Sequence, residues 1–128
     1  EPASTMARVA VGWLTTVDPK GRPYSVPVWI LRLPDGRILV YTRAGKRKID
    51  NLACNPEVTL ALDVTDIGRD VIRIEGQAHV DTGMPPADQH PEYRAKYAER
   101  IGTMFATAAD FAALFSVPLI ITPRRLLT

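Results

Sequence analysis

The sequence predicts a mainly β (α+β) fold, with six antiparallel strands curled into a barrel and flanking helices. First, short runs of alternating apolar and polar residues recur along the chain, as in half-buried strands. Second, the turn sequences DPKG at residues 18–21 and PDG at residues 34–36 separate these runs closely enough for hairpins. Third, few helical segments intervene, which favours an antiparallel sheet. Six strands of this length would expose their edges unless the sheet closes.

The expected elements follow the chain in order. Residues 1–7 are a frayed start or the end of a helix. Strands are expected at residues 8–17, 24–33, 37–42, 57–64, 71–80 and 117–122, the last continuing past residue 123 after an irregularity. Helices are expected at residues 46–54, 92–101 and 106–115, a turn at residues 66–69, and a proline-rich connection at residues 82–91. Tyr93, Tyr97 and Ile101 recur at helical spacing, and the two tyrosines are expected to pack against the barrel.

Composition bounds the class of protein. The 128 residues are expected to form one domain, residues 1–128, which needs no disulfide to fold. The single Cys54 cannot form an internal disulfide, which fits a reducing, cytoplasmic location. No apolar run approaches the ~20 residues that cross a bilayer, and no signal peptide is visible, so no membrane partner is expected. A net charge of +2 provides no general surface for nucleic acid.

A basic stretch at residues 41–52 is the first candidate binding site. Arg43, Lys46, Arg47 and Lys48 lie between the end of an expected strand and the start of an expected helix. Unpaired backbone N–H groups and the helix dipole favour anions at a helix start, and Lys and Arg side chains add to that field. The stretch therefore indicates a phosphate site, with a solvated basic turn as the equally weighted alternative.

A proline inside an apolar strand is the second candidate. Pro27 cannot donate a hydrogen bond to a neighbouring strand, so it is expected at an edge or a bulge. Together with Trp29 it would form a flat surface for a planar ring. The alternative is an edge strand with a core tryptophan. A ring surface and a phosphate site on neighbouring strands suit an aromatic cofactor with a phosphorylated tail.

Other chemistry has little support. His79, His90 and Cys54 do not have the spacing of a metal site, so no metal is expected. Cys54 is interpreted as a packing residue, and Glu75 as an ion-pair partner rather than a general base. No acid/base pair is evident, so the catalytic residues stay unassigned. Hydride transfer fits this absence, because the cofactor carries the reactive chemistry and the protein supplies orientation.

Several motifs in register carry a resemblance to a known family. They are WLTTVDPKGRP at residues 13–23, SVPVW at 25–29, YTRAGKRK at 41–48, NL at 51–52, NP at 55–56 and IEG at 74–76. In this order they resemble the pyridoxamine 5'-phosphate oxidase-like split β-barrels. Within that family the chain is most similar to the flavin/deazaflavin oxidoreductases that use coenzyme F420.

The resemblance implies a homodimeric, six-stranded split β-barrel with two cofactor sites at the interface, each lined by both subunits. It implies that Thr42, Lys46 and Lys48 contact the cofactor phosphate, with Arg43 and Asn51 nearby. The remaining implied contacts are the ring-binding residues Val26, Pro27, Val28 and Trp29, and the partner-subunit strand around Ile72 and Arg73.

The resemblance also implies a reaction, namely hydride transfer from reduced coenzyme F420 to an unsaturated small-molecule substrate. FMN is the alternative cofactor, although Val71 stands where flavin-binding members often have a polar residue. Pyridoxamine 5'-phosphate oxidases proper have a longer C-terminal part, so that specific activity is not expected. The alternative from another class is a non-catalytic protein that binds a cofactor or a tetrapyrrole. Nucleic-acid binding through residues 43–48 is the weakest alternative.

Overall fold

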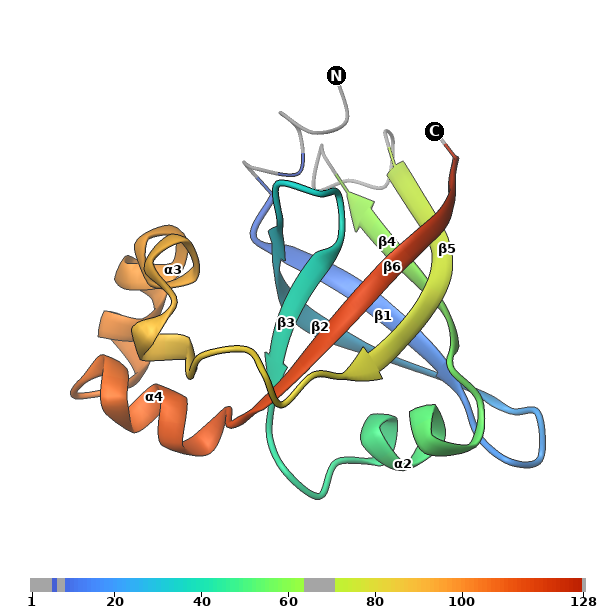
Figure 1. The fold of residues 1–128 in the computed structure, drawn as a ribbon, viewed down its shortest axis with the longest axis horizontal. Helices are drawn as coiled ribbons and strands as arrows, with labels where there is room; N and C mark the ends of the chain where they lie inside the picture. Colours follow the sequence, from blue (N-terminus) through green and yellow to red (C-terminus); the bar gives the residue numbers. More distant parts are fainter. Residues whose placement is uncertain (1–5, 7–8, 64–70, 128) are drawn as a thin grey trace.

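The computed structural model describes residue 6 and residues 9–63 and 71–127 of the protein. Six strands form a closed antiparallel barrel in the order β1-β2-β3-β6-β5-β4, with β4 also pairing with β1 (Figure 1). They are β1 (Val11–Val17), β2 (Pro23–Arg32), β3 (Ile38–Thr42), β4 (Glu57–Asp63), β5 (Val71–Val80) and β6 (Val117–Leu127). The predicted mainly β, six-stranded antiparallel barrel is confirmed. The expected turn at residues 66–69 lies outside the described residues, as does the expected chain start at residues 1–7 apart from residue 6.

The barrel interior is aliphatic and fully closed. Leu14, Ile30, Leu60, Ile74 and Leu119 are among its members, and each is at most 1% exposed. They come from five different strands, because alternate side chains of each strand point inward. Burying one such side chain stabilises the fold by roughly 1.5–3 kcal/mol, so this cluster fixes the barrel.

The bulky face of β1 points out of the barrel. Leu14 and Thr16 are buried inside, whereas Trp13 on the opposite parity is 51% exposed. The interior is too narrow for large side chains here, since a Cβ added at Gly12 would lie 2.7 Å from a methyl carbon of Leu62. The outer face of β1 is therefore an apolar surface that one chain leaves uncovered.

Strand β6 runs from residue 117 to residue 127, which confirms the predicted continuation past Pro123. The irregularity lies where Pro123 pairs with Gly76, at a register shift between Glu75 and Gly76. A Cβ added at Gly76 would lie 2.2 Å from the carbonyl oxygen of Thr122. The close crossing of β5 and β6 therefore requires glycine at this position.

Four helical segments complete the described fold. They are α2 (Arg47–Cys54), the short 3-10 helix η1 (Ala87–Gln89), α3 (Pro91–Met104) and α4 (Ala108–Leu114). Figure 1 shows α3 and α4 together on one side of the barrel, and α2 across one of its ends. The predicted helices are confirmed, with α3 four residues longer than expected. None of the described helices is long and apolar enough to cross a membrane.

A second buried cluster, made of aromatic rings, fastens α3 and α4 to the outside of the barrel. Tyr93 and Tyr97 are fully buried, as expected from their helical spacing. The Tyr97 hydroxyl donates to the backbone carbonyl of Ala10 at 2.6 Å, and the Tyr93 hydroxyl donates to that of Trp29 at 3.0 Å. Each of these hydroxyls thus has a hydrogen-bond partner. The two tyrosines connect α3 to β2 and to the chain before β1 without leaving a buried polar group unsatisfied.

We predict that Gly76→Ala lowers the free energy of unfolding by about 3 kcal/mol, because the added methyl overlaps the backbone of β6. Gly102→Ala is the matched control: a Cβ there meets nothing within 4 Å in helix α3, so it should raise the free energy of unfolding by roughly 0.5–1 kcal/mol. Urea denaturation followed by circular dichroism measures both. Equal stability of the two variants would contradict the close β5–β6 crossing.

Candidate functional site

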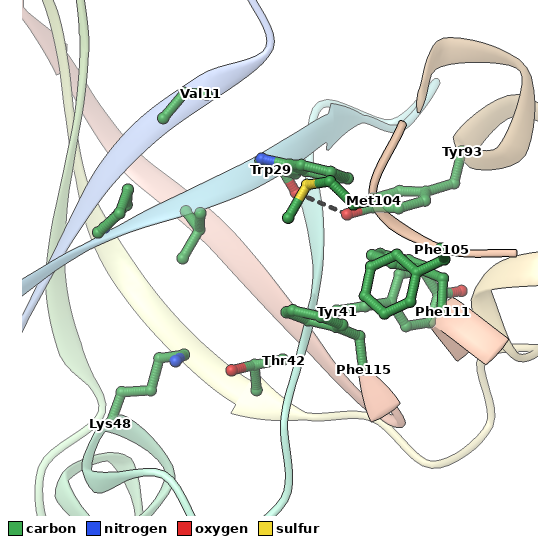
Figure 2. Close-up of a pocket in the computed structure, with 12 residues that line it drawn as sticks. Val11, Trp29, Tyr41, Thr42, Lys48, Tyr93, Met104, Phe105, Phe111 and Phe115 are labelled. Atoms are coloured by element: carbon green, nitrogen blue, oxygen red, sulfur yellow. Dashed lines mark hydrogen bonds between the residues drawn. The ribbon is translucent and has the colours of Figure 1, made fainter. Parts of the chain in front are cut away.

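A pocket of about 240 Å³ lies between the barrel and the helices α3 and α4 (Figure 2). Strands β1, β2 and β3 and helices α2, α3 and α4 all contribute to its wall. The lining residues are Val11, Pro27, Val28, Trp29, Tyr41, Thr42, Lys48, Tyr93, Met104, Phe105, Phe111 and Phe115. Three of the four predicted ring-binding residues and two of the predicted phosphate-binding residues therefore meet in one cavity.

The pocket exists because β2 is only partly paired. Strand β2 pairs with β1 from Pro23 to Trp29, but it pairs with β3 only from Ile30 to Arg32. Residues 23–29 of β2 therefore have an open side, where a proline removes no necessary hydrogen bond. Pro27 therefore lies at a local edge, as predicted: β2 has a neighbouring strand on each side of the barrel wall, but its segment around Pro27 pairs only with β1.

The polar end of the pocket is formed by Thr42 and Lys48. Thr42 is the last residue of β3 and is 3% exposed. After it the chain turns through Gly45, whose φ of +76° suits glycine, and enters α2. Lys48 lies in the first turn of α2, and its ammonium points into the pocket near the Thr42 hydroxyl (Figure 2).

Lys48 is a largely buried lysine at the polar end of the pocket. The residue as a whole is only 8% exposed. Burial lowers the pKa of its ammonium, and the nearby charge of Lys46 lowers it further. Within the described part of the chain Lys48 forms no ion pair. No side chain caps the start of α2 either, although the Ile49 N–H already donates to the Lys46 carbonyl at 3.0 Å. The arrangement is complementary to an anion.

The rest of the predicted basic stretch stays at the surface. Arg43 and Lys46 are exposed and do not line the pocket. The guanidinium of Arg47 lies 5.0 Å from the ring centroid of Tyr24 and does not reach the pocket either. The stretch thus divides into one buried cation and three exposed ones.

Four further predicted contacts lie outside this pocket. The Asn51 amide donates to the Thr16 hydroxyl at 2.9 Å, and both side chains are buried, so Asn51 ties α2 to β1. Val26 is half-buried against the barrel interior, and Ile72 is part of that interior. Arg73 is exposed on β5. The expectation that the strand around Ile72 and Arg73 approaches the cofactor of a partner subunit stays a prediction.

Trp29 partly fits both interpretations drawn from the sequence, a surface for a planar ring and a core tryptophan. It lines the pocket, but it is also stacked within the chain. The ring of Tyr97 stacks on the indole at 5.1 Å and 9°, and that of Phe111 at 5.6 Å and 12°. Trp29 therefore anchors α3 and α4 and forms part of the wall, rather than offering its whole face to a ligand.

The aromatic wall contributed by α3 and α4 was missing from the sequence-based site. Met104, Phe105, Phe111 and Phe115 lie more than 60 residues beyond Thr42 in the chain. They reach the pocket because β6 pairs with β3, with Val117 opposite Thr42, immediately after α4 ends. The only signal that could have placed them is this strand pairing, which periodicity does not reveal.

No group of three or more His, Cys, Asp or Glu side chains suitable for a metal ion occurs in the described ranges. His79 and His90 lie outside the pocket. Among the lining residues the ionisable side chains are Lys48 and two tyrosines, whose hydroxyls already donate to backbone carbonyls. The wall can therefore bind an anion and an apolar ring, but it presents no carboxylate or imidazole.

The closed six-stranded antiparallel barrel with its outer helices defines the split β-barrel class of proteins. A family profile described as pyridoxamine 5'-phosphate oxidase matches residues 4–117. The chain is 35% identical over 88 residues to a pyridoxine/pyridoxamine 5'-phosphate oxidase of Bacteroides thetaiotaomicron; these residues are 68% of this chain and 39% of that protein. The chain therefore belongs to the pyridoxamine 5'-phosphate oxidase family, and the match spans about two-fifths of this relative's length.

Solved structures show the same fold. A structure described as an F420 reductase superposes with a TM-score of 0.72 at 20% identity, covering 97% of this chain and 94% of that chain. HutZ, the heme storage protein of Vibrio cholerae, superposes with a TM-score of 0.68 at 17% identity, covering 98% of this chain and 89% of that chain. At these identities the likeness concerns the fold alone.

We predict that Lys48→Met makes the ligand-free protein more stable, raising the free energy of unfolding by up to about 1 kcal/mol, because an apolar side chain replaces a half-buried ammonium that has no ion-pair partner among the described residues. Lys46→Met, at an exposed position, is the control and should change stability by less than ~0.5 kcal/mol. Urea denaturation of both variants checks this. A destabilised Lys48→Met protein would show that the ammonium has a structural partner.

Proposed function

We propose that this protein is an oxidoreductase that binds a phosphorylated aromatic redox cofactor in the pocket, and that the cofactor is coenzyme F420, with FMN as the alternative. The observation that carries the proposal is the half-buried Lys48 ammonium beside Thr42, which has no ion-pair partner among the described residues and lies next to the apolar segment Pro27–Trp29. An anion would pair with this lysine charge, and an apolar wall would hold a ring. One cavity supplies both.

Each part of the pocket has a separate task in this proposal. Lys48 and Thr42 bind the phosphate, and Lys48 does so with a charge-assisted contact that contributes roughly 1.5–3 kcal/mol. Pro27, Val28 and Trp29 orient the ring. When bound, the reduced cofactor supplies a hydride. The aromatic wall excludes water, and because the wall holds no carboxylate or imidazole, the chain acts chiefly by orientation.

The choice of F420 over FMN rests on the motif resemblance, on the apolar Val71 at the start of β5, and on the fold shared with a structure described as an F420 reductase. The non-catalytic tetrapyrrole alternative has less support in this pocket. Haem iron is usually held by an axial side chain such as histidine, and neither of the two histidines lines the cavity.

A second copy of the chain would complete the site. The pocket of about 240 Å³ is smaller than the roughly 300–1,000 Å³ of most small-molecule sites. The outer face of β1 exposes Trp13, and β5 exposes Val71 at its start. We therefore propose a homodimer in which these apolar faces are buried and a partner strand covers the cofactor.

We predict a particle of twice 14.1 kDa in light scattering at micromolar concentration. Trp13→Glu should shift the protein toward the monomer, because it places a charge on the proposed interface. Lys20→Glu, in the exposed β1–β2 turn, is the control for the charge itself and should remain dimeric. A mass near 14.1 kDa for the unaltered protein would refute the shared site.

We predict that cofactor-free protein binds F420 more tightly than FMN in fluorescence titrations at fixed ionic strength. Lys48→Met should weaken F420 binding by roughly tenfold or more, since it removes a charge-assisted phosphate contact, whereas Lys46→Met should have little effect. Tighter FMN binding would move the protein to the flavin alternative. An unchanged dissociation constant for Lys48→Met would remove Lys48 from the site, and binding of neither cofactor would overturn the proposed function.

A further inference from the structure

We infer that Asn51 and Thr16 are positioning residues for the polar end of the pocket: their buried hydrogen bond sets the rotation of α2, and that rotation directs the Lys48 ammonium into the pocket. The inference rests on the proposed function, because it concerns the side chain that would bind the cofactor phosphate. Neither Asn51 nor Thr16 lines the pocket, so each acts on a ligand only through Lys48.

The buried polar residues of the described chain gather where α2 lies across the end of the barrel (Figure 1). Lys48 and Asn51 belong to α2, and Thr16 accepts a hydrogen bond from Asn51. Thr42 lies near Lys48 at the end of β3 (Figure 2). Among the described residues only His90, at the start of α3, is a buried polar residue elsewhere. An otherwise aliphatic barrel thus has its polar groups at the end next to the pocket.

Helical spacing links Asn51 to Lys48. Residues three apart on an α-helix lie on the same face, so both side chains project from the buried side of α2. The Asn51 amide donates to the Thr16 hydroxyl at 2.9 Å, and Thr16 is 0% exposed in the paired strand β1. A rotation of α2 that turned Lys48 toward solvent would therefore break this hydrogen bond.

Little else in the described chain fixes the rotation of α2. The Asn51–Thr16 contact is the only hydrogen bond between a side chain of α2 and a strand within the described ranges. Leu52 packs against the barrel interior, but apolar contacts are not directional. The Arg47 guanidinium over the Tyr24 ring is exposed to solvent. One directional contact therefore determines how α2 is oriented.

A polar pair at this place has no advantage for stability alone. Replacing both partners of a buried hydrogen bond with apolar groups of the same shape is often neutral or stabilising. A buried polar pair instead favours one arrangement over others, because a shift leaves a donor or an acceptor without a partner. The pair therefore suits a site in which the direction of one ammonium matters.

The ligand-free protein provides the first test. We expect Thr16→Val to raise the pKa of Lys48 toward its usual value, because burial lowers that pKa and a freed α2 would let the ammonium reach water. Thr16→Ser keeps the hydroxyl and should leave the pKa of Lys48 unchanged. NMR titration of the Lys48 side chain measures both. An unchanged pKa in Thr16→Val, or an equal rise in Thr16→Ser, would overturn the inference.

Cofactor binding provides the second test. Phosphate selectivity is defined as the dissociation constant of the phosphate-free ring compound, riboflavin or the deazaflavin core of F420, divided by that of FMN or F420. We expect Thr16→Val to lower this ratio by about fivefold or more, because Lys48 loses its charge-assisted contact, and to leave binding of the phosphate-free compound unchanged. Thr16→Ser should retain the selectivity.

A matched control checks that the loss of a hydrogen bond is not itself the cause. Thr103→Val removes a side-chain hydrogen bond within α3, away from α2, and should retain the phosphate selectivity. If Thr16→Val weakened binding of the phosphorylated and phosphate-free compounds equally, the damage would be general and the positioning role would be refuted.

Two further variants separate positioning from stability. Thr16→Val combined with Asn51→Leu leaves neither partner unpaired, so this double variant should fold as stably as the unaltered protein and still lose phosphate selectivity. In a Lys48→Met background, Thr16→Val should lower the selectivity no further, because both changes act through the same ammonium. Retained selectivity in the double variant, or an additive loss with Lys48→Met, would contradict the inference.

The two proposals can fail separately. A raised pKa of Lys48 in Thr16→Val, without binding of F420 or FMN to the unaltered protein, would keep the positioning role and remove the proposed function. Phosphate-selective cofactor binding that Thr16→Val leaves intact would keep the proposed function and remove the positioning role.

Discussion

The aromatic stack around Trp29 is the interaction on which the rest of the site depends. Trp29 pairs with Val11 in the barrel, and its indole stacks on Tyr97 and Phe111 from the two outer helices. Its backbone carbonyl also accepts the Tyr93 hydroxyl. One residue therefore joins the barrel, the helical layer and the pocket. Because closely packed rings tolerate little displacement, the position of the pocket wall follows from the position of Trp29.

The pocket combines two local features that work against stability. Residues 23–29 of β2 do not pair with β3, and Lys48 is largely buried with no ion-pair partner in the part of the chain that the structure describes. In an isolated barrel each would be a defect, since unpaired strand edges and buried charges are normally avoided. Their occurrence side by side, together with an otherwise apolar wall, is typical of a binding site, where a ligand supplies the missing partners.

The family of this protein follows from the sequence match, whereas its chemistry is argued from its own pocket. Membership of the pyridoxamine 5'-phosphate oxidase family follows from a match over residues 4–117. The chemistry of this chain rests on its own residues, because the matched oxidase is longer and the structural relatives include both a reductase and a heme storage protein. The combination of an ammonium and a hydroxyl with an apolar wall in one pocket is the feature from which the cofactor is argued.

The sequence by itself determined the strands, the helices, the barrel and half of the pocket. Alternation and turn residues act locally, so they located Pro27 and Trp29 on one strand and Thr42 and Lys48 at the end of another. Only the tertiary structure decided that Lys48 turns inward while Arg43 and Lys46 remain exposed, that Asn51 bonds to Thr16, and that the bulky face of β1 points outward. It also brought Phe111 and Phe115 beside Thr42. Those outcomes depend on which strands pair across 60 or more residues and on the narrow space inside the barrel, and neither is encoded in local periodicity.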